Sequence, residues 1–183
     1  MSNRQKREKG NGVLDTSLEE LREIYIQLRA RTMEKWNRCL PLAELLVDRW
    51  EKASYLGFGE GCSVHDSCYV YGDVKVGIGT WIGPNTLLDG TAGLCIGDHC
   101  SISAGVQIYT HDSVDWALSG GSEEYKLAST TIGSNCYIGP NSIIAKGVTI
   151  GDGCVIGAMS LVLRDIPAHS KAWGTPAKVI EHT

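Results

Sequence analysis

The 183-residue chain has a single phenylalanine, no long apolar run and no excess of positive charge. Because a helix needs about 20 apolar residues to cross a bilayer, we expect no integral membrane segment. The first ten residues are basic and lack the apolar stretch of a signal peptide, so we expect a cytoplasmic protein. A formal net charge of −4 gives no field that would attract nucleic acid, and we expect no such partner.

The seven cysteines include no C-x-x-C pair, which is the spacing typical of zinc and redox motifs. Five of them fall at one small position of the repeat described below: Cys62, Cys68, Cys100, Cys136 and Cys154. We therefore expect these thiols to be buried as small apolar side chains in a reducing compartment, and we expect no metal. The places of Cys39 and Cys95 stay open.

Two regions of the chain have different compositions, since only Gly10 and Gly12 of the 22 glycines precede residue 57. Residues 1–14 are polar and charged, which predicts a disordered basic tail. Residues 15–57 are predicted to form N-terminal helices, and residues 58–183 are predicted to form the main domain.

The helical region carries two start signals. Thr16 and Glu19 have the spacing of a capping box, and apolar residues then recur at helical intervals at Leu18, Leu21, Ile24, Tyr25 and Leu28. Pro41 suits the first position of a second helix, predicted over about 41–55. We expect both stripes to pack on the rest of the chain or on another subunit, and their role stays open.

From Phe58 onward an aliphatic residue recurs every six residues, with a small or β-branched residue four places later. The sequence keeps this register apart from a two-residue slip near 88–95, and the aliphatic openers are Val64, Val70, Val76, Ile82, Ile96, Ile102, Ile108, Ile132, Ile138, Ile144, Ile150, Ile156 and Val162. A period of six is neither the two of a flat strand nor the 3.6 of a helix. It predicts short strands wrapped into a stacked β-solenoid, and it leaves the hand of the coil open.

Repeats such as Ile132-Gly-Ser-Asn-Cys-Tyr and Ile150-Gly-Asp-Gly-Cys-Val, followed by Trp173-Gly-Thr-Pro-Ala-Lys, resemble those of the hexapeptide-repeat acyltransferases. The ending and the excursion after Thr110-His111-Asp112 are similar to maltose and galactoside O-acetyltransferases and to sugar acetyltransferases of polysaccharide biosynthesis. The resemblance implies a mainly β fold, a left-handed parallel β-helix after an N-terminal helical region. It also implies a homotrimer with acetyl-coenzyme A (acetyl-CoA) bound between adjacent subunits.

His111 stands where the repeat breaks. Asp112 falls at a small inward position, and an unpaired carboxylate is costly to bury there, so we expect the chain to leave the coil over residues 112–131. Transfer of acetyl to a hydroxyl requires removal of a proton, and an imidazole with an ordinary pKa of about 6.5 suits that task. The resemblance also places the family's catalytic histidine at this point, so His111 is the predicted general base.

The remaining predicted site residues follow from the resemblance. Asn85 matches the second asparagine of a family segment that contacts the reacting groups, although closing a turn would explain it equally well. Its spacing from His111 places the two on different faces of one coil, so we expect them to meet only across a subunit interface. Trp116 would offer an apolar plate to a sugar ring. The predicted contacts to coenzyme A are Ala158, Leu163, Arg164 and Lys178.

The predicted function is acetyl-CoA-dependent O-acetylation of a sugar hydroxyl, by direct attack in a ternary complex. The acceptor would be a small molecule or a glycan. N-acetylation of an amino sugar, free or nucleotide-linked, would share the base and donor and stays open, as does the length of the acyl chain. A non-catalytic scaffold is a more distant alternative. A zinc enzyme on the same coil would need three converging imidazoles, and His65, His99 and His111 include no closely spaced pair.

Overall fold

The computed structural model describes the backbone of residues 3–182 and the side chains of residues 15–181. The chain divides into two compact units, Met1–Val47 and Asp48–Thr183. The boundary between the two units therefore lies ten residues before the predicted boundary at residue 57. The reason is that the helix just before the coil belongs to the second unit. No helix in the described part of the chain is long and apolar enough to span a bilayer.

The first unit is helical, with α1 over Asn3–Trp36 and α2 over Leu42–Leu46. The structure differs here from the predicted disordered tail, because residues 3–14 continue α1, while residues 1–2 lie outside the described part. Extending an existing helix fixes fewer dihedral angles per hydrogen bond than starting one. The helix predicted from Thr16 accordingly begins earlier.

The second unit opens with α3 (Arg49–Tyr55), so the single helix predicted over 41–55 is wrong. Asp48 has extended backbone, and its side chain accepts hydrogen bonds from the backbone N–H groups of Trp50 and Glu51. An aspartate that caps a new helix in this way ends the preceding one. Ala53 of α3 is buried in the core, and α3 packs on the first strand of the coil.

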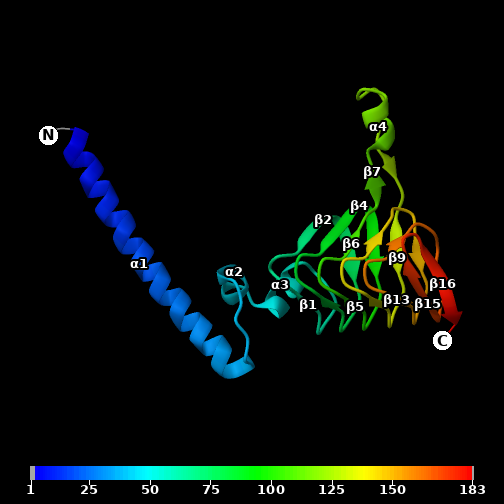
Figure 1. Cartoon of the computed structure of the whole chain (residues 1–183), viewed down its shortest axis with the longest axis horizontal. Helices are drawn as coiled ribbons and strands as arrows, with labels where there is room; N and C mark the ends of the chain where they lie inside the picture. Colours follow the sequence, from blue (N-terminus) through cyan, green and yellow to red (C-terminus); the bar gives the residue numbers. More distant parts are fainter. Residues whose placement is uncertain (1–2, 183) are drawn as a thin grey trace. The chain divides into compact units, whose positions relative to one another are not determined.

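The rest of the unit is a parallel β-solenoid (Figure 1), which confirms the predicted mainly β fold class. One face stacks, in order, β1 (Ser63–Val64), β3 (Trp81–Ile82), β5 (Ser101–Ile102), β10 (Tyr137–Ile138), β13 (Val155–Ile156) and β15 (Ser170–Gly174), and β16 (Ala177–His182) adds antiparallel to the last. The other faces carry β2 (Tyr69–Val76), β4 (Leu87–Ile96), β6 (Gln107–Ile108), β9 (Thr130–Ile132), β11 (Ile143–Ile144), β12 (Thr149–Ile150) and β14 (Leu161–Val162).

The strand register confirms that three hexads make one coil. Val64 pairs with Ile82, and Ile144 with Val162, each 18 residues further along the chain. Between β2 and β4 the pairing shifts by two residues after Gly90. The slip predicted near 88–95 therefore lies at one corner of the coil. At this corner the backbone N–H of Ala92 donates to the Thr110 hydroxyl at 3.0 Å.

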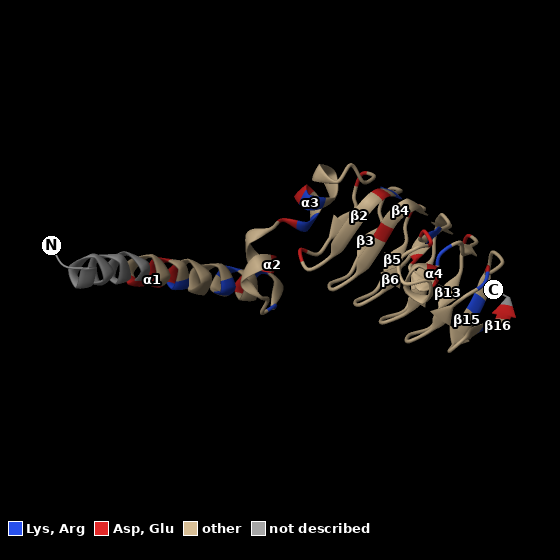
Figure 2. Cartoon of the chain, turned by 90° about the horizontal axis from the view of Figure 1, so that it is seen from above, with Lys and Arg blue, Asp and Glu red and all other residues tan. Residues whose placement is uncertain are grey.

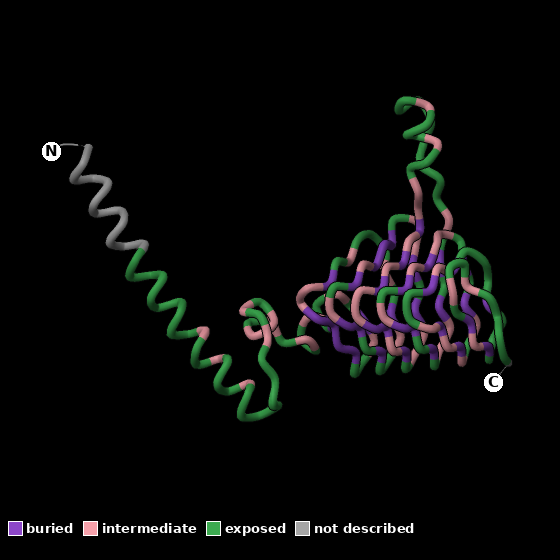
Figure 3. The backbone as a smooth tube through the Cα atoms, viewed as in Figure 1, coloured by how far each residue is buried: buried purple, intermediate pink, exposed green. Residues whose placement is uncertain are grey.

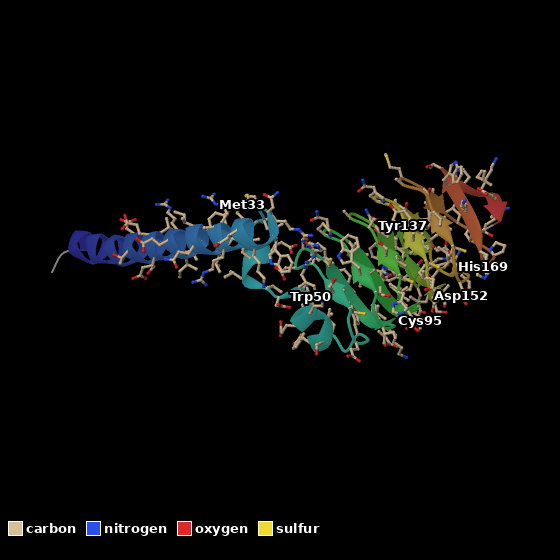
Figure 4. The ribbon with its side chains drawn as sticks, turned by 90° about the horizontal axis from the view of Figure 1, so that it is seen from below. Met33, Trp50, Cys95, Tyr137, Asp152 and His169 are labelled. Atoms are coloured by element: carbon tan, nitrogen blue, oxygen red, sulfur yellow. The ribbon has the colours of Figure 1, made fainter. Side chains whose placement is uncertain are left out.

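The aliphatic openers line the inside of the coil, where Figure 3 shows the buried residues. The five cysteines of the small position are buried as predicted, and Cys39 and Cys95 are exposed (Cys95 is labelled in Figure 4). All five buried thiols donate to backbone carbonyls at 2.8–3.1 Å: Cys62 to Gly77, Cys68 to Gly83, Cys100 to Gly133, Cys136 to Gly151 and Cys154 to Pro167. These thiols thus each have a hydrogen-bond acceptor, as buried polar groups usually do.

Candidate functional site

One excursion interrupts the coil after β6. Its strands β7 (His111–Asp112) and β8 (Lys126–Leu127) pair antiparallel, and α4 (Val114–Leu118) lies near the tip of this hairpin. Figure 1 shows the hairpin projecting away from the stacked strands. The excursion falls within residues 111–129 rather than the predicted 112–131, because β9 has already rejoined the coil at Thr130. The buried Thr130 hydroxyl donates to the Tyr109 carbonyl at 2.7 Å, which closes the base of the hairpin.

His111 is paired with a buried carboxylate at the base of this hairpin. Its Nδ1 lies 2.6 Å from Oδ2 of Asp89 in β4, and the side chains are 33% and 2% exposed. An ionised carboxylate only accepts hydrogen bonds, so in the neutral imidazole Nδ1 carries the proton and Nε2 keeps its lone pair. The contact therefore sets the tautomer that a general base requires.

Asp89 is held ionised by its surroundings. Burial alone would raise the pKa of this carboxyl, but hydrogen bonds from Thr91, Thr110 and His111 lower it well below its usual range. The Thr91 backbone N–H and hydroxyl donate to Oδ1 at 2.9 and 2.5 Å, and the Thr110 backbone N–H donates to Oδ2 at 2.8 Å. Asp89 was not identified in the sequence analysis. The available signal was a carboxylate directly after the inward residue Leu88, beside the two-residue slip.

Aromatic side chains of the hairpin lie beside His111. The Tyr125 ring stacks on the imidazole, with centroids 6.0 Å apart and planes 29° apart, and Trp116 meets Tyr125 edge-on at 5.9 Å. The two aromatic residues border an open depression of about 510 Å³ that also includes Thr91 and Leu127. A volume of this order suits a small-molecule site. Trp116 thus lines a pocket next to the predicted base, and Tyr125 was missed.

Asn85 lies at a different corner, in the turn between β3 and β4. Its φ of 57° is in the left-handed region that asparagine tolerates, and its backbone N–H donates to the Ser67 hydroxyl at 3.2 Å. The turn therefore accounts for the asparagine. Within one chain the structure does not bring Asn85 to His111, and a catalytic role for Asn85 stays a prediction.

The four residues predicted to contact coenzyme A are exposed and do not gather at one point of the chain. Leu163 and Arg164 follow β14, which stacks through β11 on β6, so they lie on the same edge as Thr110 and the base of the hairpin. Two strand spacings separate these positions, about 10 Å. By contrast Ala158 lies in a turn on another edge, and Lys178 lies in β16 opposite Trp173.

An ion pair joins the hairpin to the coil. Lys146, on the edge that leads to Arg164, pairs with Asp112 at 3.2 Å. Among residues 15–181 no three His, Cys, Asp or Glu side chains converge as metal ligands. His65 instead meets Arg49, with Nε2 and the guanidinium 3.0 Å apart.

A family model described as bacterial transferase hexapeptide (six repeats) matches residues 129–164. Over these residues the chain is similar to the hexapeptide repeats of bacterial transferases. It is 47% identical to protein CapG of Staphylococcus aureus over 87 residues, which are 47% of this chain and 51% of that protein. It is 39% identical to nodulation protein L of Rhizobium meliloti (strain 1021) over 107 residues, 58% of each. The chain thus spans between half and two thirds of these curated relatives.

Solved structures of acyltransferases are similar over more of the chain. A galactoside acetyltransferase in complex with coenzyme A superposes with a TM-score of 0.66 at 28% identity, covering 86% of this chain and 82% of that one. A hexapeptide-repeat acetyltransferase of Vibrio cholerae O1 biovar eltor with acetyl-CoA gives 0.65 at 27% identity, covering 91% and 88%. The N-acyltransferase AntD of Bacillus cereus, with dTDP and 3-hydroxybutyryl-CoA, gives 0.62 at 25% identity, covering 68% and 71%. The resemblance to hexapeptide-repeat acyltransferases is confirmed.

Proposed function

We propose that the protein is an acetyl-CoA-dependent O-acetyltransferase that transfers acetyl to a sugar hydroxyl, with His111 as general base. The observation that carries this proposal is the contact between His111 Nδ1 and the buried Asp89 carboxylate. It leaves Nε2 as proton acceptor beside an aromatic pocket. The similarity to acetyltransferases solved with coenzyme A or acetyl-CoA supports the choice of donor.

The chemistry proceeds by direct attack. The acceptor hydroxyl passes its proton to His111 Nε2 as its oxygen bonds to the acetyl carbonyl carbon, and the tetrahedral intermediate then collapses with loss of the coenzyme A thiolate. The imidazolium returns the proton to that sulfur. Asp89 stabilises the imidazolium while it exists, as the carboxylate of a hydrolytic triad does. Residues 111–127 contain no cysteine, so the hairpin offers no thiol for an acyl-enzyme.

Acetyl-CoA would lie along the edge that joins His111 to Arg164. The Arg164 guanidinium and the Lys178 ammonium would bind its phosphates, and main-chain groups at Ala158 and Leu163 would contact its pantetheine arm. Because Ala158 and Lys178 are on other parts of the coil surface, a groove between two subunits would bring the set together better than one chain does. A homotrimer with the site at each interface is therefore part of the proposal.

N-acylation of an amino sugar is the second candidate, favoured by the similarity to AntD, an N-acyltransferase solved with dTDP. A neutral amine already has a lone pair and depends less on a base than a hydroxyl does. The buried carboxylate behind His111 therefore favours a hydroxyl acceptor.

A thiol-release assay with acetyl-CoA tests the proposal on matched sugars that differ only in carrying a hydroxyl or an amino group. We expect turnover on hydroxyl-only sugars, and a loss of at least about 10²-fold in kcat for His111→Ala with acetyl-CoA affinity retained. Turnover confined to amino sugars would select N-acylation. A His111→Ala variant with full activity on any acceptor would refute the assignment of the base.

A further inference from the structure

We infer that the pocket on the hairpin selects an acceptor ring that carries no phosphate or carboxylate, through the carboxylates of Glu123 and Glu124. The inference rests on the proposed function and narrows its substrate class. It begins from the pocket, whose border includes Glu123 and Glu124 together with Trp116 and Tyr125.

The pocket and the base share one hydrogen-bond network. Thr91 lines the pocket, and its hydroxyl and backbone N–H both donate to Asp89, which holds His111. Tyr125 lines the pocket as well, and its ring stacks on the imidazole. A ring bound in this depression would therefore lie against Thr91 and Tyr125, the two lining residues that contact the pair of Asp89 and His111.

The charges of the hairpin do not balance at this pocket. Asp112 pairs with Lys146, and Asp115 pairs with Lys126 at 2.5 Å. Neither Glu123 nor Glu124 forms an ion pair with any residue of the described part of the chain, and both are exposed. The hairpin and its partner Lys146 thus carry two more negative than positive charges, and Glu123 and Glu124 lie on the wall of the pocket. Asp115, and to a smaller extent Glu123, raise the pKa of Lys126. Figure 2 shows the charged residues around α4.

The composition of the pocket fits a neutral or amino-bearing sugar. The faces of Trp116 and Tyr125 suit the C–H faces of a pyranose, and carboxylates accept hydrogen bonds from its hydroxyl or ammonium groups. A phosphate or carboxylate on the same ring would meet two like charges within a short distance, and such repulsion disfavours binding. Acceptors linked through a sugar phosphate would therefore bind weakly.

Pairs of acceptors with the same hydroxyls test this inference: methyl α-galactoside against α-galactose 1-phosphate, and the corresponding pair of N-acetylglucosamine. We expect kcat/KM to be at least about fivefold higher for the glycoside of whichever pair is acetylated. In Glu123→Gln/Glu124→Gln the ratio of kcat/KM between glycoside and phosphate should shrink at least threefold, roughly the loss of two screened like charges. Added salt should reduce the ratio of kcat/KM between glycoside and phosphate in the wild type, and should reduce it much less in the variant.

Glu51→Gln/Glu60→Gln is the matched control, because it removes the same net charge near the first coil. We expect it to keep the wild-type preference. Equal or better use of the phosphates by the wild type would overturn the inference, and so would a preference that the Glu123/Glu124 variant leaves unchanged. Binding of the same acceptors to His111→Ala, followed by ligand-observed NMR, provides a readout without turnover. If the wild type transferred no acetyl group to any acceptor while binding stayed selective, that result would count against the proposed function and not against this inference.

Discussion

At the scale of single residues, the pairing of His111 with Asp89 is the feature on which catalysis would depend. Asp89→Asn keeps the shape of the side chain but can donate to Nδ1, which favours the tautomer with the proton on Nε2. We expect kcat to fall by at least about 10²-fold, with acetyl-CoA affinity nearly unchanged. Thiol release at saturating donor measures the effect, and a variant with wild-type kcat would show that the carboxylate has no positioning role.

The same carboxylate makes a prediction about stability and pH. The folded state lowers the pKa of Asp89 below its unfolded value of about 3.9, so its stabilising contribution is present above that pH and is lost as the pH falls toward the folded pKa. Urea unfolding of wild type and Asp89→Asn at pH 7 and near pH 3 measures this. We expect the wild type to be more stable than the variant at pH 7 and the difference to narrow near pH 3. A constant difference would mean that the fold does not favour the ionised form.

At the scale of elements, the hairpin is built so that its tip can be removed without disturbing the coil. Thr130 and Tyr109 close its base by a hydrogen bond, and α4 has no buried residue. Replacing residues 113–124 by a short Gly-Ser turn should therefore leave the melting temperature within a few degrees, while removing Trp116 and the pocket wall. We expect KM for the acceptor to rise about tenfold or more with donor affinity retained. Calorimetry and steady-state kinetics measure the two effects, and an unchanged acceptor KM would place the acceptor elsewhere.

The coil was predictable from sequence because each hexad buries an aliphatic side chain in the same way, so the sequence period and the burial period are the same. Each aliphatic opener from Val64 to Val162 meets the same interior, so one period determines which side chains are buried. His111 was found for the converse reason, since it stands where that period fails. The contact with Asp89 was not predictable, because it depends on which corner accommodates the two extra residues after Gly90. The end of α2 before Asp48 was not predicted, because the apolar stripe of the sequence continues through Trp50 and favours one helix. The Asp48 carboxylate instead caps a new helix.

At the scale of the whole molecule, one chain holds the base, the pocket and Arg164, and it keeps Asn85 at another corner. A repeated coil has the same few edges along its length, so residues on different edges of one chain cannot converge however long the coil is. They can converge when a neighbouring copy presents its own edge. This is the physical reason for expecting the complete site to need a closed homo-oligomer.

Mixed trimers test that expectation. If each site takes Asn85 from one subunit and His111 from the next, refolding equal amounts of Asn85→Ala and His111→Ala chains together creates sites with both residues intact. Random assortment gives each site a probability of about one quarter of being intact, so we expect about a quarter of wild-type activity from two parents that each have little. Sites contained within one chain would always lack one residue, and the mixture would then be no more active than its parents. Mixing the two proteins without refolding is the control, because preformed trimers that do not exchange subunits should regain nothing.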